Sequence, residues 1–177
     1  MPQSQESGIR LLDPASPLTR VLDAALRAGS VRWIGLRPGR YQPLVPAGTA
    51  DLDPETGLAG DHYRSRANQA RQVTLIQAEH LATIAGYLGL VTIEPGRLRR
   101  NIVVSGINLL ALKGRRFRLG TAVLLCTGEC HPCSGMEAIL GTGGYNVVRG
   151  HGGVTARILS AGQVRLGDLI ERDDGAG

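Results

Sequence analysis

Apolar residues near the start of the chain recur at helical spacing. After Pro17 they stand at positions 18, 21, 22, 25 and 26, and Gly29 follows the run. This spacing places them on one face of a helix, and glycine commonly ends a helix. We therefore predict a short amphipathic helix between Pro17 and Ala28, capped by Ser16 or Thr19, within an N-terminal extension that covers residues 1–30.

The pattern then changes to short apolar and β-branched runs separated by glycines. We predict strands at residues 31–36, 71–76, 101–105, 116–119, 122–126, 155–160 and 168–171. Helical spacing returns in residues 77–86, which end at a glycine. A stretch rich in proline and glycine, up to Gly60, reads as a long loop.

These elements predict a mainly β fold, a barrel or a sandwich, with a few helices packed on its outside. The 25 glycines supply the turns that such a fold requires. A chain of 177 residues suits one core, so we expect one β domain over residues 31–171 and a disordered tail over residues 172–177.

Composition narrows the range of partners. Aromatic residues make up 3% of the chain, which removes the stacking platforms of single-stranded nucleic-acid binders. The net charge is +5, but the basic residues are spread among acidic ones rather than gathered in one block, which favours an anionic small molecule over DNA. The tightest basic groups either line a phosphate pocket or face water, and they are Arg97, Arg99 and Arg100, and Lys113, Arg115, Arg116 and Arg118.

Localisation follows from what the sequence contains. No run approaches the ~20 apolar residues that span a bilayer, and residues 1–8 are polar, unlike a signal peptide. The three cysteines, Cys126, Cys130 and Cys133, lie within eight positions, unlike the spaced framework of a secreted disulfide domain. We expect a cytoplasmic protein with reduced thiols and no membrane contact.

The segment Cys130-His131-Pro132-Cys133 carries the strongest chemical signal. Two sulfurs at this spacing can converge, and a thiolate there can carry a persulfide, attack an electrophile or bind a soft metal. Neighbouring Glu129 and His131 are candidates to hold or move a proton. Cys126 lies within an apolar run, so we expect it to be a small buried residue, whereas Cys133 should lie in a loop.

Three other interpretations of the cysteines stay open. A structural zinc site needs four ligands, which His62, His80 or His151 would have to complete. A thioredoxin-like motif needs a βαβ context, and no crossover helix lies behind this segment. All three cysteines can also be buried as small apolar residues.

Arg100-Asn101 precedes the predicted run Ile102 to Ser105, so both side chains lie at the edge of a strand, where they can reach a pocket. Arginine offers a planar fork for an anion, and asparagine offers a donor and an acceptor. The same pair can instead satisfy loop carbonyls. The glycine runs at residues 141–144 and 150–153 lack the surroundings of phosphate or dinucleotide loops, so we expect ordinary turns there.

The order of six segments resembles the MOSC family, named for the C-terminal domain of molybdenum-cofactor sulfurases. They are GLAGDH (57–62), RQVTLI (71–76), RRNIVV (99–104), GINL (106–109), CHPC (130–133) and GQVRLGD (162–168). The resemblance covers roughly residues 31–171.

The resemblance implies a β-barrel and a pocket around a cysteine, which accepts sulfur from a pyridoxal-phosphate-dependent desulfurase or holds molybdenum cofactor. Some relatives reduce N-hydroxylated bases and amidoximes. Carried over to this chain, the catalytic residues are Cys133 and Cys130, and Cys133 is the metal ligand. The cofactor-binding residues are Arg71, Arg100, Asn101 and His131.

The chain departs from two branches of the family. It has no cysteine beyond Cys133, where the amidoxime-reducing branch has its proposed molybdenum ligand. It also lacks an aminotransferase-like half, so any pyridoxal phosphate is expected in a partner. We retain three hypotheses: a molybdenum-cofactor enzyme with a small-molecule substrate and a redox partner, a sulfur carrier served by a cysteine desulfurase, and a non-catalytic anion-binding module.

Overall fold

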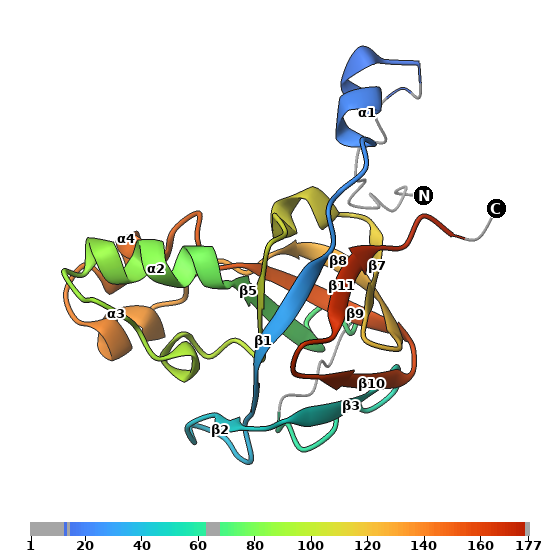
Figure 1. Cartoon of the computed structure of the whole chain (residues 1–177). Coiled ribbons are helices and arrows are strands. Elements are labelled where there is room, and N and C mark those ends of the chain that lie inside the picture. Colours follow the sequence, from blue (N-terminus) through green and yellow to red (C-terminus); the bar gives the residue numbers. More distant parts are fainter. Residues whose placement is uncertain (1–12, 14, 63–67, 176–177) are drawn as a thin grey trace, which may run out of the picture.

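The predicted strands fold into a closed barrel. The computed structural model describes residues 13, 15–62 and 68–175. Neighbouring strands follow the order β11 (Leu169–Arg172), β7 (Arg116–Leu119), β8 (Ala122–Glu129), β9 (Val154–Ser160), β5 (Val73–Gln77), β6 (Ile102–Ser105) and β1 (Gly29–Leu36). β1 also pairs with β11, which closes the ring (Figure 1). The mainly β, barrel-type fold with a few helices is confirmed.

The barrel forms because its strands alternate between apolar and polar positions. In β7, Phe117 and Leu119 are fully buried in the interior, whereas Arg116 and Arg118 point to solvent. The interior is otherwise filled by aliphatic side chains, as the low aromatic content requires.

β5 is buried along its whole length because both of its faces are covered. Leu75 belongs to the apolar cluster inside the barrel, and Ile76 belongs to a second cluster beneath the helices. Successive side chains of a strand point to opposite faces, so Thr74 shares the outer face with Ile76. A hydroxyl therefore stands on the outer wall of the barrel next to the helices.

Several helices gather on one side of the barrel (Figure 1). They are α2 (Ala78–Tyr87), α3 (Gly135–Leu140) and α4 (Gly144–Val148), and the second apolar cluster packs between them and the strands. Two 3₁₀ turns, η1 (Pro95–Leu98) and η2 (Leu109–Leu112), flank β6. Glu137 of α3 accepts hydrogen bonds from the amides of Gly143 and Tyr145, which joins α3 to α4.

α1 (Pro17–Leu22) is shorter than the sequence predicts, and it contributes no buried residue. It stands away from the barrel (Figure 1), and the Ser16 hydroxyl accepts a hydrogen bond from the amide of Leu18. Without a core to pack against, few turns of helix are stable. Residues 1–12 and 14 of the predicted extension, and 176–177 of the predicted tail, lie outside the described residues.

The segment up to Gly60 differs from the predicted loop. It contains β2 (Val45–Pro46), which pairs with β1, and a small sheet in which β3 (Thr49–Asp53) lies between β4 (Gly57–Leu58) and β10 (Gly162–Arg165). These strands have two to five residues, and β10 pairs across more than 100 positions with β3. Because the paired strands lie so far apart in the sequence, no local pattern predicts them.

Candidate functional site

A pocket opens on the outer wall of the barrel beside Thr74. We call it the arginine pocket; its volume is about 130 Å³, and it is lined by Arg37, Arg71, Thr74, Arg99, Arg100, Cys133 and Met136. Its arginines come from the end of β1 and from the residues that precede β5 and β6. Four guanidinium groups and one thiol therefore converge from segments far apart in the sequence, and such a group attracts anions.

Arg37 is held in place by a buried carboxylate. Asp61 is 2% exposed, and its Oδ1 accepts a hydrogen bond from the Arg37 amide at 2.7 Å. Its Oδ2 lies 3.2 Å from Nη2 of Arg37. Asn101 donates to the same carboxylate at 3.0 Å, while its oxygen accepts from the Thr74 hydroxyl at 2.9 Å. This network orients two of the pocket-lining residues, Arg37 and Thr74.

Arg100 is buried, and each of its three side-chain nitrogens already donates to a backbone carbonyl. The acceptors are Gly152 at 2.7 Å, Leu98 at 2.8 Å and Cys130 at 3.1 Å. Burial lowers the pKa of the Arg100 guanidinium, which nevertheless stays protonated. Arg100 therefore contributes charge to the pocket and fixes the loop of Cys130, while Arg71 and Arg99 are the more accessible arginines.

Arg99 has an unusual backbone conformation for an arginine. It ends η1 with φ of 57°, in the left-handed region, which costs a residue with a side chain about 1–2 kcal/mol. Such strain often accompanies function. Here it accompanies a side chain that lines the arginine pocket.

We expect Arg99→Gly to be at least as stable as the wild type and to bind inorganic phosphate about tenfold more weakly, because a charge-assisted hydrogen bond is lost. Glycine relieves the strain but has a more flexible unfolded chain, so the net gain should not exceed about 1 kcal/mol. Urea unfolding and calorimetric titration measure the two effects. Tyr41→Gly is the control, because Tyr41 also has positive φ, of 63°, and is exposed outside the pocket. Unchanged phosphate affinity in Arg99→Gly would contradict the expectation.

The three cysteines are free thiols in different surroundings. Cys133 is exposed at the arginine pocket, as its loop position predicts. Cys130 is 1% exposed, and its Sγ accepts a hydrogen bond from Nη2 of Arg71 at 3.5 Å. Cys126 is sealed in the barrel core, as predicted, and burial raises its pKa to about 11. The structure thus brings Cys133, Cys130, Arg71 and Arg100 together.

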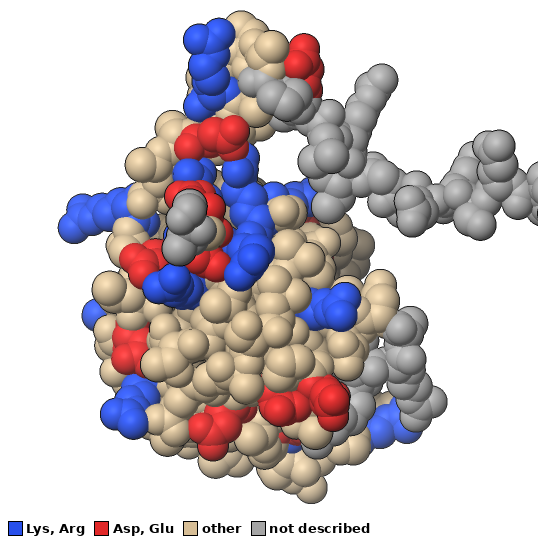
Figure 2. Space-filling view, turned by 90° about the vertical axis from the view of Figure 1, so that its right-hand side faces the viewer, with Lys and Arg blue, Asp and Glu red and all other residues tan. Residues whose placement is uncertain are grey.

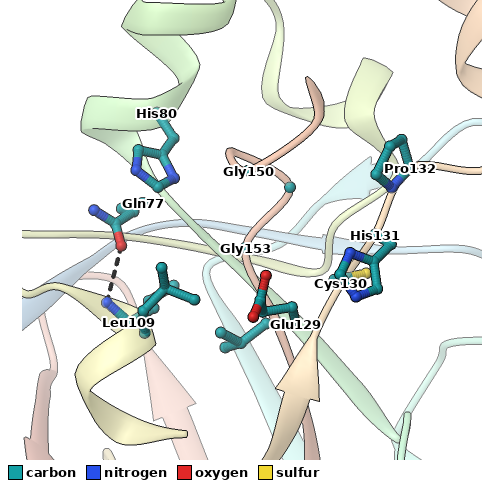
Figure 3. Close-up of a pocket in the computed structure, with 12 residues that line it drawn as sticks. Gln77, His80, Leu109, Glu129, Cys130, His131, Pro132, Gly150 and Gly153 are labelled. Atoms are coloured by element: carbon teal, nitrogen blue, oxygen red, sulfur yellow. Dashed lines mark hydrogen bonds between the residues drawn. The ribbon is translucent and has the colours of Figure 1, made fainter. Parts of the chain in front are cut away.

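The other two predicted cofactor-binding residues do not line the arginine pocket. Asn101 is 1% exposed and acts through the Asp61 network. His131 is exposed and lines a separate hollow, where it stands with Glu129 and Cys130 opposite Gln77 and His80 (Figure 3). That hollow has a volume of about 10 Å³, enough for one water molecule. The assignment of Asn101 and His131 as cofactor-binding residues stays a prediction.

His80 packs edge to face against His151, with ring centroids 5.0 Å apart, and the Nδ1 atoms of both rings are buried without a hydrogen-bond partner among the described residues. Desolvation lowers the pKa of His80, and the charge of His151 lowers it further. His62 lines a different hollow. In the described part of the chain, no three His, Cys, Asp or Glu side chains stand close enough together to hold a metal ion.

The lowered pKa of His80 predicts a stability that falls in acid. The unfolded chain, with a histidine pKa near 6.5, binds the proton more readily than the folded chain. Unfolding is therefore favoured as the pH falls through about 6.5 toward the lower folded-state pKa. We expect urea unfolding between about pH 7.5 and 5 to show this loss, and His80→Gln to reduce it. An identical pH dependence in the variant would contradict the role of His80.

Most other members of the two basic groups pair with acidic or carbonyl groups. Arg97 donates to the carbonyl of Ile139. Figure 2 shows basic and acidic side chains interleaved on the face that carries the C-terminal strand. Among the described residues, the ion pairs of the two basic groups join Lys113 to Glu129, Arg115 to Asp23, and both Arg116 and Arg118 to Asp173. Arg99 and Arg100 are the members of these groups that line the arginine pocket.

Comparisons agree with this architecture. The protein-family model of the MOSC domain matches residues 61–171. No curated protein matches the chain in sequence. The described helices include none with the length and apolar character of a membrane span.

Solved structures share the fold. The YuaD protein from Bacillus subtilis is 24% identical with a TM-score of 0.73, over 83% of this chain and 96% of that chain. YiiM from Escherichia coli is 17% identical with a TM-score of 0.62, over 84% and 71% of the two chains. YiiM from Geobacillus stearothermophilus is 15% identical with a TM-score of 0.67, over 81% and 74%.

Proposed function

The chain belongs to the MOSC domain family, and on that premise we propose that its arginine pocket binds the phosphorylated molybdenum cofactor, with the Cys133 thiolate as a ligand of the metal. The observation that supports this proposal is the exposed thiol of Cys133 among four guanidinium groups. A soft thiolate suits molybdenum, and guanidinium groups suit a phosphate.

The residues present fit a metal ion that is already coordinated by sulfur atoms of its cofactor. The described residues hold no cluster of three metal-binding side chains, so Cys133 would be one protein ligand beside the sulfur atoms of the cofactor. Asp61 pairs with Arg37, and its single carboxylate does not cancel the charge of the four guanidinium groups that line the pocket. The chemistry of the donors therefore agrees with an anionic pterin cofactor.

The volume available around the site is the second point of comparison with a pterin cofactor. The arginine pocket of about 130 Å³ holds only part of a pterin cofactor. Beyond the Arg37–Asp61 ion pair lies a second open hollow of about 350 Å³, lined by Pro38, Gly60, Asp61 and His62. Because Asp61 of this hollow pairs with Arg37 of the arginine pocket, a cofactor larger than the pocket would extend past the ion pair toward the second hollow.

Within the pocket, Arg71 and Arg99 would bind the phosphate, while Arg100 supplies charge and holds the Cys130 carbonyl. When bound, the molybdenum cofactor supplies two-electron redox chemistry. Reduction of an N-hydroxylated compound, with electrons from a redox partner, is the reaction that the family resemblance implies. The Thr74 hydroxyl, which donates to the Asn101 side chain and accepts from the Asn101 amide, would be a neutral polar contact for such a substrate at the wall of the pocket.

The test is the cofactor content of protein made in a host that synthesises molybdenum cofactor. We expect molybdenum, measured by plasma mass spectrometry, and pterin, measured by fluorescence after oxidation, in equal amounts. The proposal would be overturned if the purified protein contains no molybdenum and also does not bind cofactor released from another molybdenum enzyme.

Sulfur carriage is a second candidate, favoured by the exposure of Cys133, because a partner desulfurase must reach the accepting sulfur. After incubation with cysteine and a pyridoxal-phosphate-dependent desulfurase, the chain should gain one sulfur atom by mass spectrometry. Cys133→Ala should gain none. An unchanged wild-type mass would contradict this candidate. A non-catalytic anion-binding module would call for a buried, unreactive Cys133, and the thiol is exposed.

A further inference from the structure

Cys130 and Cys133 are three positions apart but differ sharply in access. Cys133 is exposed, whereas Cys130 is 1% exposed. A thiol sealed in this way is shielded from partners and reagents in solution. Thiol exchange at Cys130 is therefore expected with a sulfur of its own loop rather than with a partner in solution. The other cysteine of that loop is Cys133.

Residues that line the arginine pocket contact Cys130, although Cys130 itself lines the small hollow of His131. Arg71, which lines the pocket with Cys133, donates to the Sγ of Cys130 at 3.5 Å. The Cys130 amide donates to the carbonyl of Gly153 at 2.8 Å, and its own carbonyl accepts from Arg100. Both thiols also lie within electrostatic range of the Arg100 guanidinium. The backbone of Cys130 is therefore held at both its amide and its carbonyl. Its sulfur lies beside Arg71, which lines the arginine pocket together with Cys133.

We propose that Cys130 is a resolving thiol: when Cys133 carries a persulfide, the Cys130 sulfur attacks the Cys133 Sγ, closes a disulfide and releases hydrosulfide. The new bond joins the two Sγ atoms, and the sulfur–sulfur bond of the persulfide breaks. The outer sulfur leaves with the bonding electrons and takes up the proton of Cys130. That sulfur is reduced to sulfide while the two cysteines are oxidised, and an external dithiol then reduces the disulfide. This inference rests on the sulfur-carrier candidate.

Cys126 does not compete for this role. It lies inside the barrel core, and burial raises its pKa to about 11, so it forms little thiolate. Cys-x-x-Cys spacing, in contrast, permits a disulfide when the loop brings the two side chains together. The α3 helix begins two residues after Cys133 and leaves the loop itself outside regular structure.

The experiment loads the full chain with sulfane sulfur from inorganic polysulfide, or from desulfurase and cysteine, and then removes the donor. We expect the wild type to release one hydrosulfide per chain and to lose two hydrogen atoms in mass, with peptide mapping that joins Cys130 to Cys133. Cys130→Ser should instead retain one added sulfur and release hydrosulfide no faster than Cys133→Ser. Cys130→Ala, checked for folding by circular dichroism, repeats the test without a hydroxyl.

The outcomes separate the two proposals. If the wild type and Cys130→Ser both retain the added sulfur and release equal hydrosulfide, Cys130 is not a resolving thiol, although Cys133 carries sulfur. If neither chain takes up sulfur from either donor, sulfur carriage fails and this inference fails with it. A disulfide that joins Cys133 of one chain to Cys133 of another would also overturn the inference.

Discussion

Cys133→Ser is expected to keep the barrel folded and to lose the molybdenum that we expect to co-purify with the wild type. The side chain is exposed on a loop, so its replacement should change the free energy of unfolding by no more than about 0.5 kcal/mol. A serine hydroxyl is far less acidic than a thiol and forms little of the anion that ligates a metal, and no other described group supplies a second thiol at the exposed edge of the pocket. Molybdenum content by plasma mass spectrometry, beside a urea unfolding curve, measures both effects.

The matched control is Ser134→Ala, which changes the next exposed side chain of the same loop and should retain the metal. Arg71→Met extends the test to the phosphate, because it removes the accessible charge that lies beside both cysteines. It should reduce pterin content as well as molybdenum. A Cys133→Ser protein with wild-type molybdenum would show that another group ligates the metal.

The sequence predicts the barrel well because its strands carry strong local patterns. All seven predicted strands correspond to barrel strands, within a few residues at each end. The short strands β2, β3, β4 and β10 were missed because they depend on pairing partners rather than on their own composition. The helices α3 and α4 were missed because their segment contains Gly135, Gly141, Gly143 and Gly144, and glycine disfavours helix.

The site was predicted only where the residues stand next to a recognisable motif. Cys133, Arg71 and Arg100 lie in segments that the family resemblance marks, and the structure places them together. The role of Arg37 was missed because its partner, Asp61, lies 24 positions away, across the segment assigned to a loop. Its position immediately after a predicted strand, like that of Arg100 immediately before one, was the available signal. The tertiary contacts of Arg37 depend on barrel closure, which local pattern does not describe.

Substitutions in the backbone behind the candidate site should destabilise the protein far more than substitutions of its exposed side chains, and Gly153 provides a test. It has φ of 82°, and a Cβ there would lie 1.9 Å from the carbonyl oxygen of Leu75 and 2.9 Å from the Cα of Ile76. Both atoms belong to the backbone of the buried strand β5, so neither can turn aside. Gly153→Ala should therefore destabilise the fold by more than about 4 kcal/mol, or prevent folding.

Gly150→Ala is the control that separates crowding from backbone strain. Gly150 has nearly the same φ, 77°, but a Cβ there would meet nothing within 4 Å. Its substitution should cost only the left-handed conformation, about 1–2 kcal/mol in urea unfolding. Because the Gly153 carbonyl accepts the amide of Cys130, any folded Gly153→Ala protein should also expose Cys130 to thiol reagents, which Gly150→Ala should not. Equal losses of stability in the two variants would mean that β5 shifts to accommodate the added Cβ. The packing of Gly153 against β5 would then not hold the loop of Cys130 in place.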